Sequence, residues 1–449
     1  MVLTNINVSN FKSFKNIDIN LNNFCLLIGA NAAGKTNFIS FLKFLNDIVK
    51  ANIEVAIYNQ GGIKFLRNLS LKEDDLSFSI TIKKDFSFPI VKLDESQSSE
   101  KIFGIDLSEL NYKLKIDFIN NSQDWKINEE KVIFSGEMYE TDFNLNTKQF
   151  NSNDLKHHKK GGYEPFIFEL YDDGDNVDYS LKNNSFGIKK ENIIHSPTIN
   201  SIYKIPNVDK SKLSILNALN KLPMYLMFEN MNFFDLDPKK CKRVNVMDNR
   251  LPQLEVSGGS SPIVIQNLGV DGGNLPIIIQ NLIKNKENKR KLLNFISYLM
   301  PTIKEIDIEN IVNNVTFKIK EEHSDEFILS YFLSDGTANI IALIVALYFN
   351  QNEFISIEEP DRNIHPKLIS KIIEMMEEVT NEKQVIITTH NPEVLKYVDN
   401  NNIYLISRNK EGFSNISKPA DNEEIKSFLD EELGIEDLFI DDLLDLGKI

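Results

Sequence analysis

Apolar positions divide the chain into two ends of mixed strand and helix and a long middle of alternating segments. Near the start, "NFCLLI" (23–28) is a continuous apolar run, typical of a short buried strand. The next segment, "NFISFLKFLNDIV" from Asn37, has apolar residues three and four apart, as in an amphipathic helix. Before both, residues 1–22 predict two strands joined by a turn.

The middle of the chain changes from strand patterns to helix patterns. Between residues 73 and 195, segments such as "LSFSITI", "YKLKIDF", "KVIFSG" and "PFIFELY" are separated by polar or glycine-containing turns. This predicts an antiparallel meander rather than a βαβ series. Residues 210–230 and 274–300 have helical periods, and Pro301 closes the second run. We find no internal repeat and no sustained heptad pattern.

The last third contains two apolar strands that end in polar residues. Phe354–Ile357 is followed by two adjacent glutamates, and Val385–Ile387 is followed by two threonines and His390. Upstream, "LSDGT" (333–337) precedes a strongly apolar helix, for which Ser334 is a good cap. The final residues are acidic with leucines interspersed, which fits either a small packed helix or a docking tail.

The loop between the first strand and the first helix has the spacing of a phosphate-binding loop. It places four residues between Gly29 and Gly34 and follows them with Lys35 and Thr36. Backbone N–H groups of such a loop can wrap a phosphate at the positive end of the helix. We expect Lys35 to be an exposed ligand of the β- and γ-phosphates, and the Thr36 hydroxyl to ligate magnesium.

The polar strand ends supply the remaining chemistry. Glu358 can hold magnesium through its coordination shell, and Glu359 can polarise the attacking water as general base. His390 follows the next strand and can donate a hydrogen bond to the γ-phosphate. At the start of the apolar helix that follows "LSDGT", Gly336 lets a phosphate approach backbone N–H groups.

Composition narrows the class of protein. A chain of 449 residues suggests about two or three domains, and the net charge of −15 argues against nucleic-acid binding over the whole surface without excluding a local basic groove. Cys25 and Cys241 form neither a disulfide framework nor a zinc pattern. No signal peptide and no membrane-spanning run is found, so we expect a cytoplasmic protein without a membrane partner.

The four motifs, in this order, resemble those of ATP-binding-cassette ATPases of the RecF, SMC and Rad50 kind. Within that class the chain is similar to the compact bacterial AAA family ATPases called AAA-21 or overcoming-lysogenization-type domains. The matching segments are "NFKSFKN" (10–16), "GANAAGKT" (29–36), "LSDGT", "FISIEEPDRNIHP" (354–366) and His390, with "DGGNLPIIIQNL" (271–282) in the helical lobe. The long coiled-coil arms of the larger relatives are absent.

The resemblance implies ATP and Mg²⁺ as ligands and a set of contacts for each. It implies that Glu359 and His390 are catalytic. The implied magnesium ligands are Thr36, Glu358 and Gln60. The implied nucleotide contacts are Lys12, Gly29, Asn31, Ala32, Ala33, Gly34, Lys35, Thr36, Asn37, Ser334 and Gly336. Asp335 stands where many relatives carry glycine, and Glu358 replaces the more usual aspartate.

An α/β fold follows from the resemblance, with a mixed sheet around the phosphate-loop helix, an antiparallel β subdomain and a helical lobe. We expect residues 1–200 to form the N-terminal part of the ATPase head, 201–304 the helical lobe, and 305–449 the C-terminal part with the acidic tail. In this family two heads enclose ATP between the phosphate loop of one and the signature of the other. A homodimer, with a higher oligomer also possible, is therefore expected.

Three functions remain open at this point. The first is a nucleotide-gated switch for a separate effector, a nuclease or toxin, in bacterial anti-phage defence. The second is a DNA-repair or DNA-organising ATPase that contacts DNA through "KKCKR" (239–243) and "KNKENKRK" (284–291). The third, a nucleotide-binding subunit of a membrane transporter, is disfavoured because the aromatic stacking loop and the usual compact spacing are missing.

Overall fold

Contacts within the computed structural model group the chain into two compact units, each built from separate stretches of sequence. Unit 1 comprises Met1–Asn22, Thr36–Glu229 and Arg408–Ile416, and unit 2 comprises Asn23–Lys35, Asn230–Ser407 and Ser417–Ile449. The structure describes residues 2–71, 73, 75–94, 99–119, 124–141, 159–172, 177–182, 231–245, 267–311, 314–350, 352–421, 423, 425 and 434–440.

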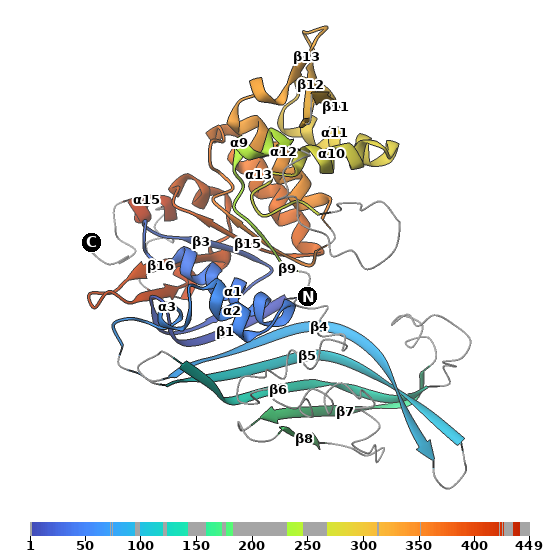
Figure 1. Cartoon of the computed structure of the whole chain (residues 1–449), viewed down its shortest axis with the longest axis vertical. Coiled ribbons are helices and arrows are strands. Elements are labelled where there is room, and N and C mark those ends of the chain that lie inside the picture. The colour runs from blue at the N-terminus through green and yellow to red at the C-terminus, as the bar shows by residue number, and fades with distance from the viewer. Residues whose placement is uncertain are drawn as a thin grey trace. The chain divides into compact units, whose positions relative to one another are not determined.

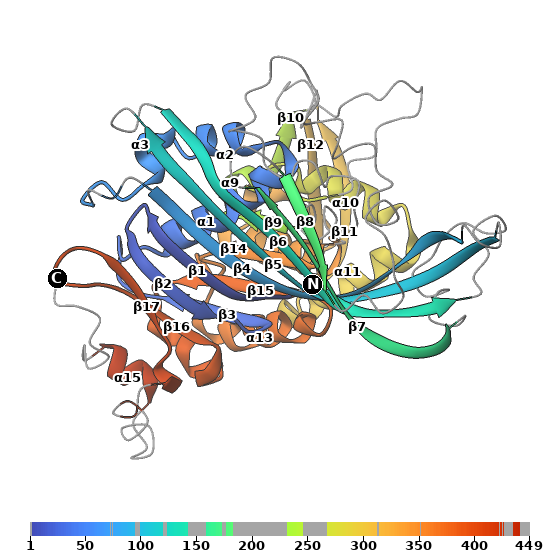
Figure 2. The same cartoon turned by 90° about the horizontal axis from the view of Figure 1, so that it is seen from below.

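Unit 1 is dominated by an antiparallel sheet whose strands follow one another in space as β8-β7-β6-β5-β4-β1-β2, with β17 next to β2 (Figure 1). Figure 2 shows β2, β1, β4, β5 and β6 of this sheet side by side. The meander expected between residues 73 and 195 is therefore confirmed for β4 to β8. The strands are β1 (Val2–Phe11), β2 (Phe14–Asn20), β4 (Asp75–Asp94), β5 (Ser99–Ile119), β6 (Asp124–Thr141), β7 (Lys159–Asp172), β8 (Val177–Lys182) and β17 (Ser414–Ser417).

Aromatic residues hold the first helix of unit 1 against this sheet. Helix α1 (Lys35–Lys50) buries its apolar face, as its period predicts. The ring of Phe41 lies 5.4 Å from that of Phe11 on β1 and 5.3 Å from that of Phe78 on β4, both nearly perpendicular to it. Such edge-to-face pairs add to the area that each ring buries. Two short helices follow, α2 (Ile53–Asn59) and α3 (Ile63–Leu66).

Unit 2 is built on a parallel sheet with the order β16-β3-β15-β14-β9. Its strands are almost wholly apolar, and β3 and β15 are buried along their full length, as expected for strands inside a parallel sheet. The strands are β3 (Phe24–Ile28), β9 (Met231–Phe234), β14 (Phe354–Glu358), β15 (Gln384–Thr389) and β16 (Ile403–Arg408).

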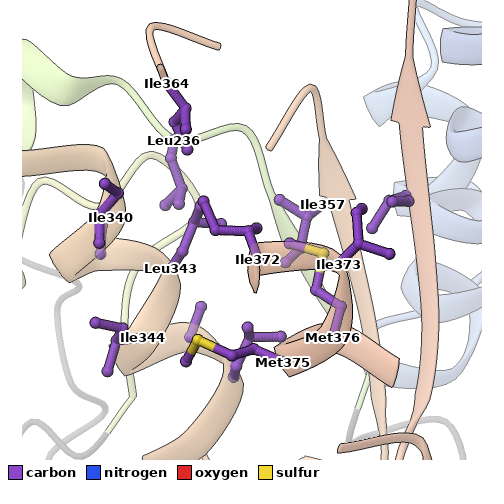
Figure 3. Close-up of a cluster of buried hydrophobic side chains, with 14 of the residues drawn as sticks. Leu236, Ile340, Leu343, Ile344, Ile357, Ile364, Ile372, Ile373, Met375 and Met376 are labelled. Carbon is purple, nitrogen blue, oxygen red and sulfur yellow. The ribbon is translucent and has the colours of Figure 1, made fainter. Parts of the chain in front are cut away.

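Helices α12 (Asp335–Tyr348) and α13 (Pro366–Glu378) share one apolar core with the strands of unit 2. Figure 3 shows Ile340, Leu343 and Ile344 of α12 converging with side chains of α13 and β14. Every residue of α12 from Ala338 to Leu347 is buried, which explains why that helix is apolar on all sides.

A helical and β-sheet region completes unit 2. Its helices are α9 (Pro238–Cys241), α10 (Leu275–Ile283), α11 (Lys286–Leu299) and α15 (Ile435–Ile440), and its small sheet contains β10 (Arg243–Asn245), β11 (Ile303–Ile311), β12 (Asn314–Glu321) and β13 (Phe327–Leu329). Among the helices that the structure describes, none is both long and apolar enough to cross a membrane.

The structure agrees with the expected mixed α/β class and differs from the expectation in detail. The helices predicted in 274–300 are present as α10 and α11, whereas the helix predicted at 210–230 lies outside the described residues. The expected helical lobe (201–304) also contains strands β9 and β10. Four residues, as in β9, are too few to show a period, so the pattern could not distinguish this strand from a helix. The expected division into three consecutive segments stays a prediction.

Candidate functional site

The phosphate loop (residues 29–36) connects β3 to α1, and its glycines are required by two different constraints. A Cβ on Gly29 would lie 2.1 Å from the carbonyl oxygen of Ile406 on β16, so only glycine fits beside that strand. Gly34 has a φ of 126°, which other residues rarely adopt. Ala32 adopts a φ of 63° despite its side chain. Asn31 and Ala32 are exposed, while Ala33 and Gly34 are buried.

The Lys35 side chain is bound to its own loop. Its ammonium group donates to the carbonyl oxygens of Gly29 at 2.7 Å and Ala30 at 3.0 Å. Lys35 is only 9% exposed, so the expectation of an exposed ligand was wrong: the loop folds around the side chain and satisfies it with carbonyl groups. Burial lowers the pKa of the ammonium group, and the carboxylate of Glu359 partly offsets that shift.

The register of the parallel strands brings three polar segments to one edge of the sheet. Thr389 of β15 pairs with Ile28 of β3, and Thr388 pairs with Glu358 of β14. The phosphate loop, the two glutamates and His390 therefore all follow strand ends at the same edge, where open parallel sheets bind their ligands.

The Glu359 side chain contacts both Arg362 and His390 at this edge. Its Oε2 accepts hydrogen bonds from Arg362, at 3.2 Å from Nε and 3.0 Å from Nη2, and its Oε1 lies 3.0 Å from Nδ1 of His390. Its own N–H donates to the Thr388 carbonyl at 2.9 Å, and its φ is 46°. Partial burial raises the pKa of Glu359, but the hydrogen bonds and charges of Arg362 and His390 outweigh it and leave the pKa below its ordinary value.

The loop after Glu359 is bound to the segment that carries His390. The Thr389 hydroxyl donates to Asp361 at 2.9 Å and accepts from the N–H of Asn391 at 3.0 Å. The His390 side chain itself is 54% exposed. The histidine can therefore reach solvent or a ligand while its backbone stays fixed.

The signature segment caps α12 as the sequence predicts. The Ser334 hydroxyl accepts from the N–H of Thr337 at 3.1 Å, and Ser334 is exposed. A Cβ on Gly336 would lie 2.4 Å from the carbonyl oxygen of Asn363, so this glycine is required for packing within its own chain. Lys242 donates to the Leu333 carbonyl and to Asp335, both at 2.7 Å.

The remaining residues predicted to contact nucleotide or magnesium lie in unit 1. Thr36 is exposed. The Asn37 amide donates to the Ser13 hydroxyl at 2.7 Å, and the Gln60 amide donates to the Ser40 carbonyl at 3.3 Å. Lys12 is half-buried, and burial together with Lys43 lowers the pKa of its ammonium group. In this structure Asn37 and Gln60 thus have protein partners.

The residues present fit magnesium bound together with a nucleotide. Glu358 and Thr36 offer the hard oxygen ligands that Mg²⁺ prefers, and the glycine-containing loop offers backbone N–H groups at the start of α1. Within the described ranges, no group of three or more His, Cys, Asp or Glu side chains could hold a metal. Magnesium in such a site depends on phosphate oxygens and water for its other ligands.

Residues 267–396 match the family model described as "AAA domain, putative AbiEii toxin, Type IV TA system". This stretch contains the signature, both glutamates and His390. This part of the chain is therefore similar to an AAA domain. Residues 29–35 of the phosphate loop belong to the same compact unit as the matched residues.

Other comparisons give shorter or more distant similarities. Endonuclease GajA of Bacillus cereus (strain VD045) is 45% identical over 47 residues, which span 10% of this chain and 8% of that protein. An SMC head bound to the C-winged helix domain of ScpA has a TM-score of 0.46 at 12% identity, covering 93% of this chain and 97% of that chain. The SMC head domain from Thermotoga maritima has a TM-score of 0.38 at 11% identity, covering 93% and 99%.

Three residues that contact the predicted site segments were missed in the sequence. Arg362 binds Glu359, Lys242 binds the signature segment, and buried Asn339 donates to the carbonyls of Pro360 at 3.4 Å and Arg362 at 2.9 Å. Asn339 did carry a signal, because it is a polar residue within an otherwise apolar helix. Lys242 lies in the basic cluster 239–243, for which DNA contact is one expectation. Here its ammonium group donates to the Leu333 carbonyl and to Asp335.

Replacing Lys35 with alanine tests the phosphate loop. We expect Lys35→Ala to abolish ATP binding, measured by isothermal titration calorimetry, because no other side chain of the loop supplies a positive charge. Since the wild-type ammonium is buried and bonded to two carbonyls, a modest loss of thermal stability should accompany it. A folded variant, checked by circular dichroism, that retains wild-type affinity would contradict the assignment.

Proposed function

We propose that the chain binds and hydrolyses ATP and acts as a nucleotide-gated switch for a separate effector protein. One observation carries the proposal: the phosphate loop, Glu358, Glu359 and His390 follow strand ends at one edge of a parallel sheet. The family match to an AAA domain supports the same reaction class.

Each group at this edge has a role in the proposed reaction. On binding, the Lys35 ammonium exchanges the carbonyls of Gly29 and Ala30 for β- and γ-phosphate oxygens, which form stronger, charge-assisted bonds. Thr36 and Glu358 would hold Mg²⁺, which when bound supplies positive charge against the phosphates. Glu359, kept ionised by its partners, accepts a proton from the attacking water.

His390 and the signature complete the proposed site. The exposed imidazole of His390 donates to the γ-phosphate, while its Nδ1 stays beside Oε1 of Glu359. Ser334 lies at the exposed N-terminus of α12, where a phosphate oxygen can be bound. We infer that this phosphate is held by a second copy of the chain, so that ATP joins two heads and hydrolysis separates them.

The effector proposal comes from the name of one similar protein and from the description of the matched family. GajA is described as an endonuclease, and the matched family is described as including a putative toxin. The residues assigned here account for nucleotide chemistry alone. We therefore propose that a nuclease or toxin is a separate partner, in a system of bacterial anti-phage defence.

A DNA-binding ATPase is the second candidate, and α11 favours it. The first half of this helix and the residue before Asn285 carry a cluster of cations on an acidic chain: Lys284, Lys286, Lys289, Arg290 and Lys291. No salt bridge to these side chains is present among the described residues. Such a cluster of cations on one helix could contact a phosphate backbone.

Separate substitutions test the two glutamates. Glu359→Gln should retain ATP and magnesium binding while slowing hydrolysis about a hundredfold or more, the scale of losing a general base. Glu358→Gln should instead raise the magnesium concentration needed for activity, because it removes a charged ligand. Phosphate release measured across a magnesium titration distinguishes them, and exchanged phenotypes would show that the two roles are reversed.

Mixing two inactive variants tests the dimer. Lys35→Ala and Ser334→Arg chains should each be inactive, whereas a mixed dimer contains one intact site, made from Lys35 of one chain and Ser334 of the other. We expect the mixture to recover part of the ATPase activity. Ser334 is preferred to Gly336 because a side chain at Gly336 would clash with Asn363 of the same chain. Mixed dimers that form but remain inactive would rule out the shared site.

Duplex DNA separates the two candidate functions. If α11 binds DNA, the wild-type protein should shift a duplex in a gel, and the shift should weaken steeply with salt. Lys286→Glu with Lys289→Glu should abolish it, while Lys113→Glu with Lys115→Glu, on β5, serves as the matched charge control. The effector-switch proposal predicts no shift that depends on α11.

A further inference from the structure

Both oxygens of the Glu359 carboxylate lie within hydrogen-bond distance of another side chain. An ionised carboxylate offers about four lone-pair positions. Arg362 occupies those of Oε2 with two N–H groups, and His390 lies against one position of Oε1. One lone pair of Oε1 therefore remains to accept a proton from water, and its direction is set by the partners on the other positions.

The main chain of Arg362 is fixed from several sides. Its N–H donates to the Glu359 carbonyl at 3.0 Å, and its own carbonyl accepts the Asn339 amide of α12 at 2.9 Å. Asn339 is 2% exposed, so this bond does not compete with solvent. The neighbouring Asp361 is held by Thr389. The guanidinium group thus extends from a backbone that cannot shift freely.

A third element holds the far side of the guanidinium group. Nη1 of Arg362 lies 3.5 Å from Oδ1 of Asp235, the residue that follows β9. The backbone N–H of Asp235 donates to the Val270 carbonyl at 2.9 Å, which anchors this carboxylate in turn. Arg362 therefore spans two carboxylates, one in the proposed catalytic position and one outside it.

We propose that Arg362 is a positioning residue for Glu359 and that Asp235 orients Arg362, so that the series Asp235, Arg362, Glu359 and His390 fixes the carboxylate that activates water. The inference rests on the proposed ATPase function and deepens it. No part of it was expected from the sequence, where Arg362 lies in the loop between β14 and α13.

The chemistry of the contact explains why arginine is present. A guanidinium group presents its N–H donors in a rigid plane and can contact two carboxylates at once, whereas a lysine ammonium is a point charge on a flexible stem. The positive charge also weakens Glu359 as a base. Orientation outweighs this effect, because misplacing a catalytic group by about 1 Å can cost about a hundredfold in rate.

The test compares steady-state ATP hydrolysis of the full chain and its variants. Arg362→Ala should lower kcat about tenfold to a hundredfold and leave KM for ATP within about twofold, since Arg362 acts on the base and not on the nucleotide. Arg362→Lys should restore part of kcat. Asp235→Asn should lower kcat less, in the same direction. The matched control is Lys396→Ala, which removes another half-exposed ion pair, to Glu393, with the same spacing of three residues.

Each outcome bears on a different claim. Unchanged kcat in Arg362→Ala, beside an active wild type and an inactive Glu359→Gln, would overturn the inference and leave the ATPase function standing. A raised kcat would also overturn it, because Arg362 would then mask the base. Equal losses in Arg362→Ala and Lys396→Ala, with equal falls in Tm, would reduce the role to general stability. A wild type without hydrolysis would overturn both proposals.

Discussion

The parallel pairing of β3, β15 and β14 is the constraint on which the site depends. Side chains along a strand alternate between faces, so a shift of one residue in either pairing would turn the polar strand ends away from one another. The observed register sets Thr389 opposite Ile28 and Glu358 opposite Thr388. Continuous apolar strands favour this arrangement because both faces are covered. The charged residue of β14, Glu358, comes at the end of its strand, and β15 ends in Thr388 and Thr389.

Opposite charges keep this edge stable despite partial burial. Burial opposes the charged form of both Lys35 and Glu359, and each is compensated: Lys35 by loop carbonyls and by Glu359, and Glu359 by Arg362 and His390. Such compensation lets a cation and a carboxylate face the same ligand without neutralising by proton transfer. A polyphosphate can replace the carbonyls at Lys35 because it supplies more negative charge.

The loop between Glu359 and Asn363 links the signature to this edge. Asn363 approaches Gly336 closely, the Arg362 carbonyl accepts from Asn339, and Asp361 is bound by Thr389. A displacement of the N-terminus of α12 would therefore act on the segment that carries Glu359. This gives the proposed switch a direct mechanical path within one chain.

Sequence alone predicted the parts of the site that have a fixed local spacing. The glycines and lysine of the phosphate loop, the two apolar strands and the cap at Ser334 are local patterns, and the structure contains the elements on which they were placed. Strand β9 was missed because four residues show no period. The burial of Lys35 was missed because spacing does not show how the loop folds around its own side chain. The Asp235–Arg362 contact was missed because it joins segments more than a hundred residues apart in the chain.

The most direct test of the account is an experimental structure of the Glu359→Gln protein with ATP and magnesium. We predict that the Lys35 ammonium leaves the Gly29 and Ala30 carbonyls for the β- and γ-phosphates. Thr36 and Glu358 should hold the metal, and His390 should face the γ-phosphate. A nucleotide bound elsewhere, or a Lys35 still bonded only to its loop, would contradict the account.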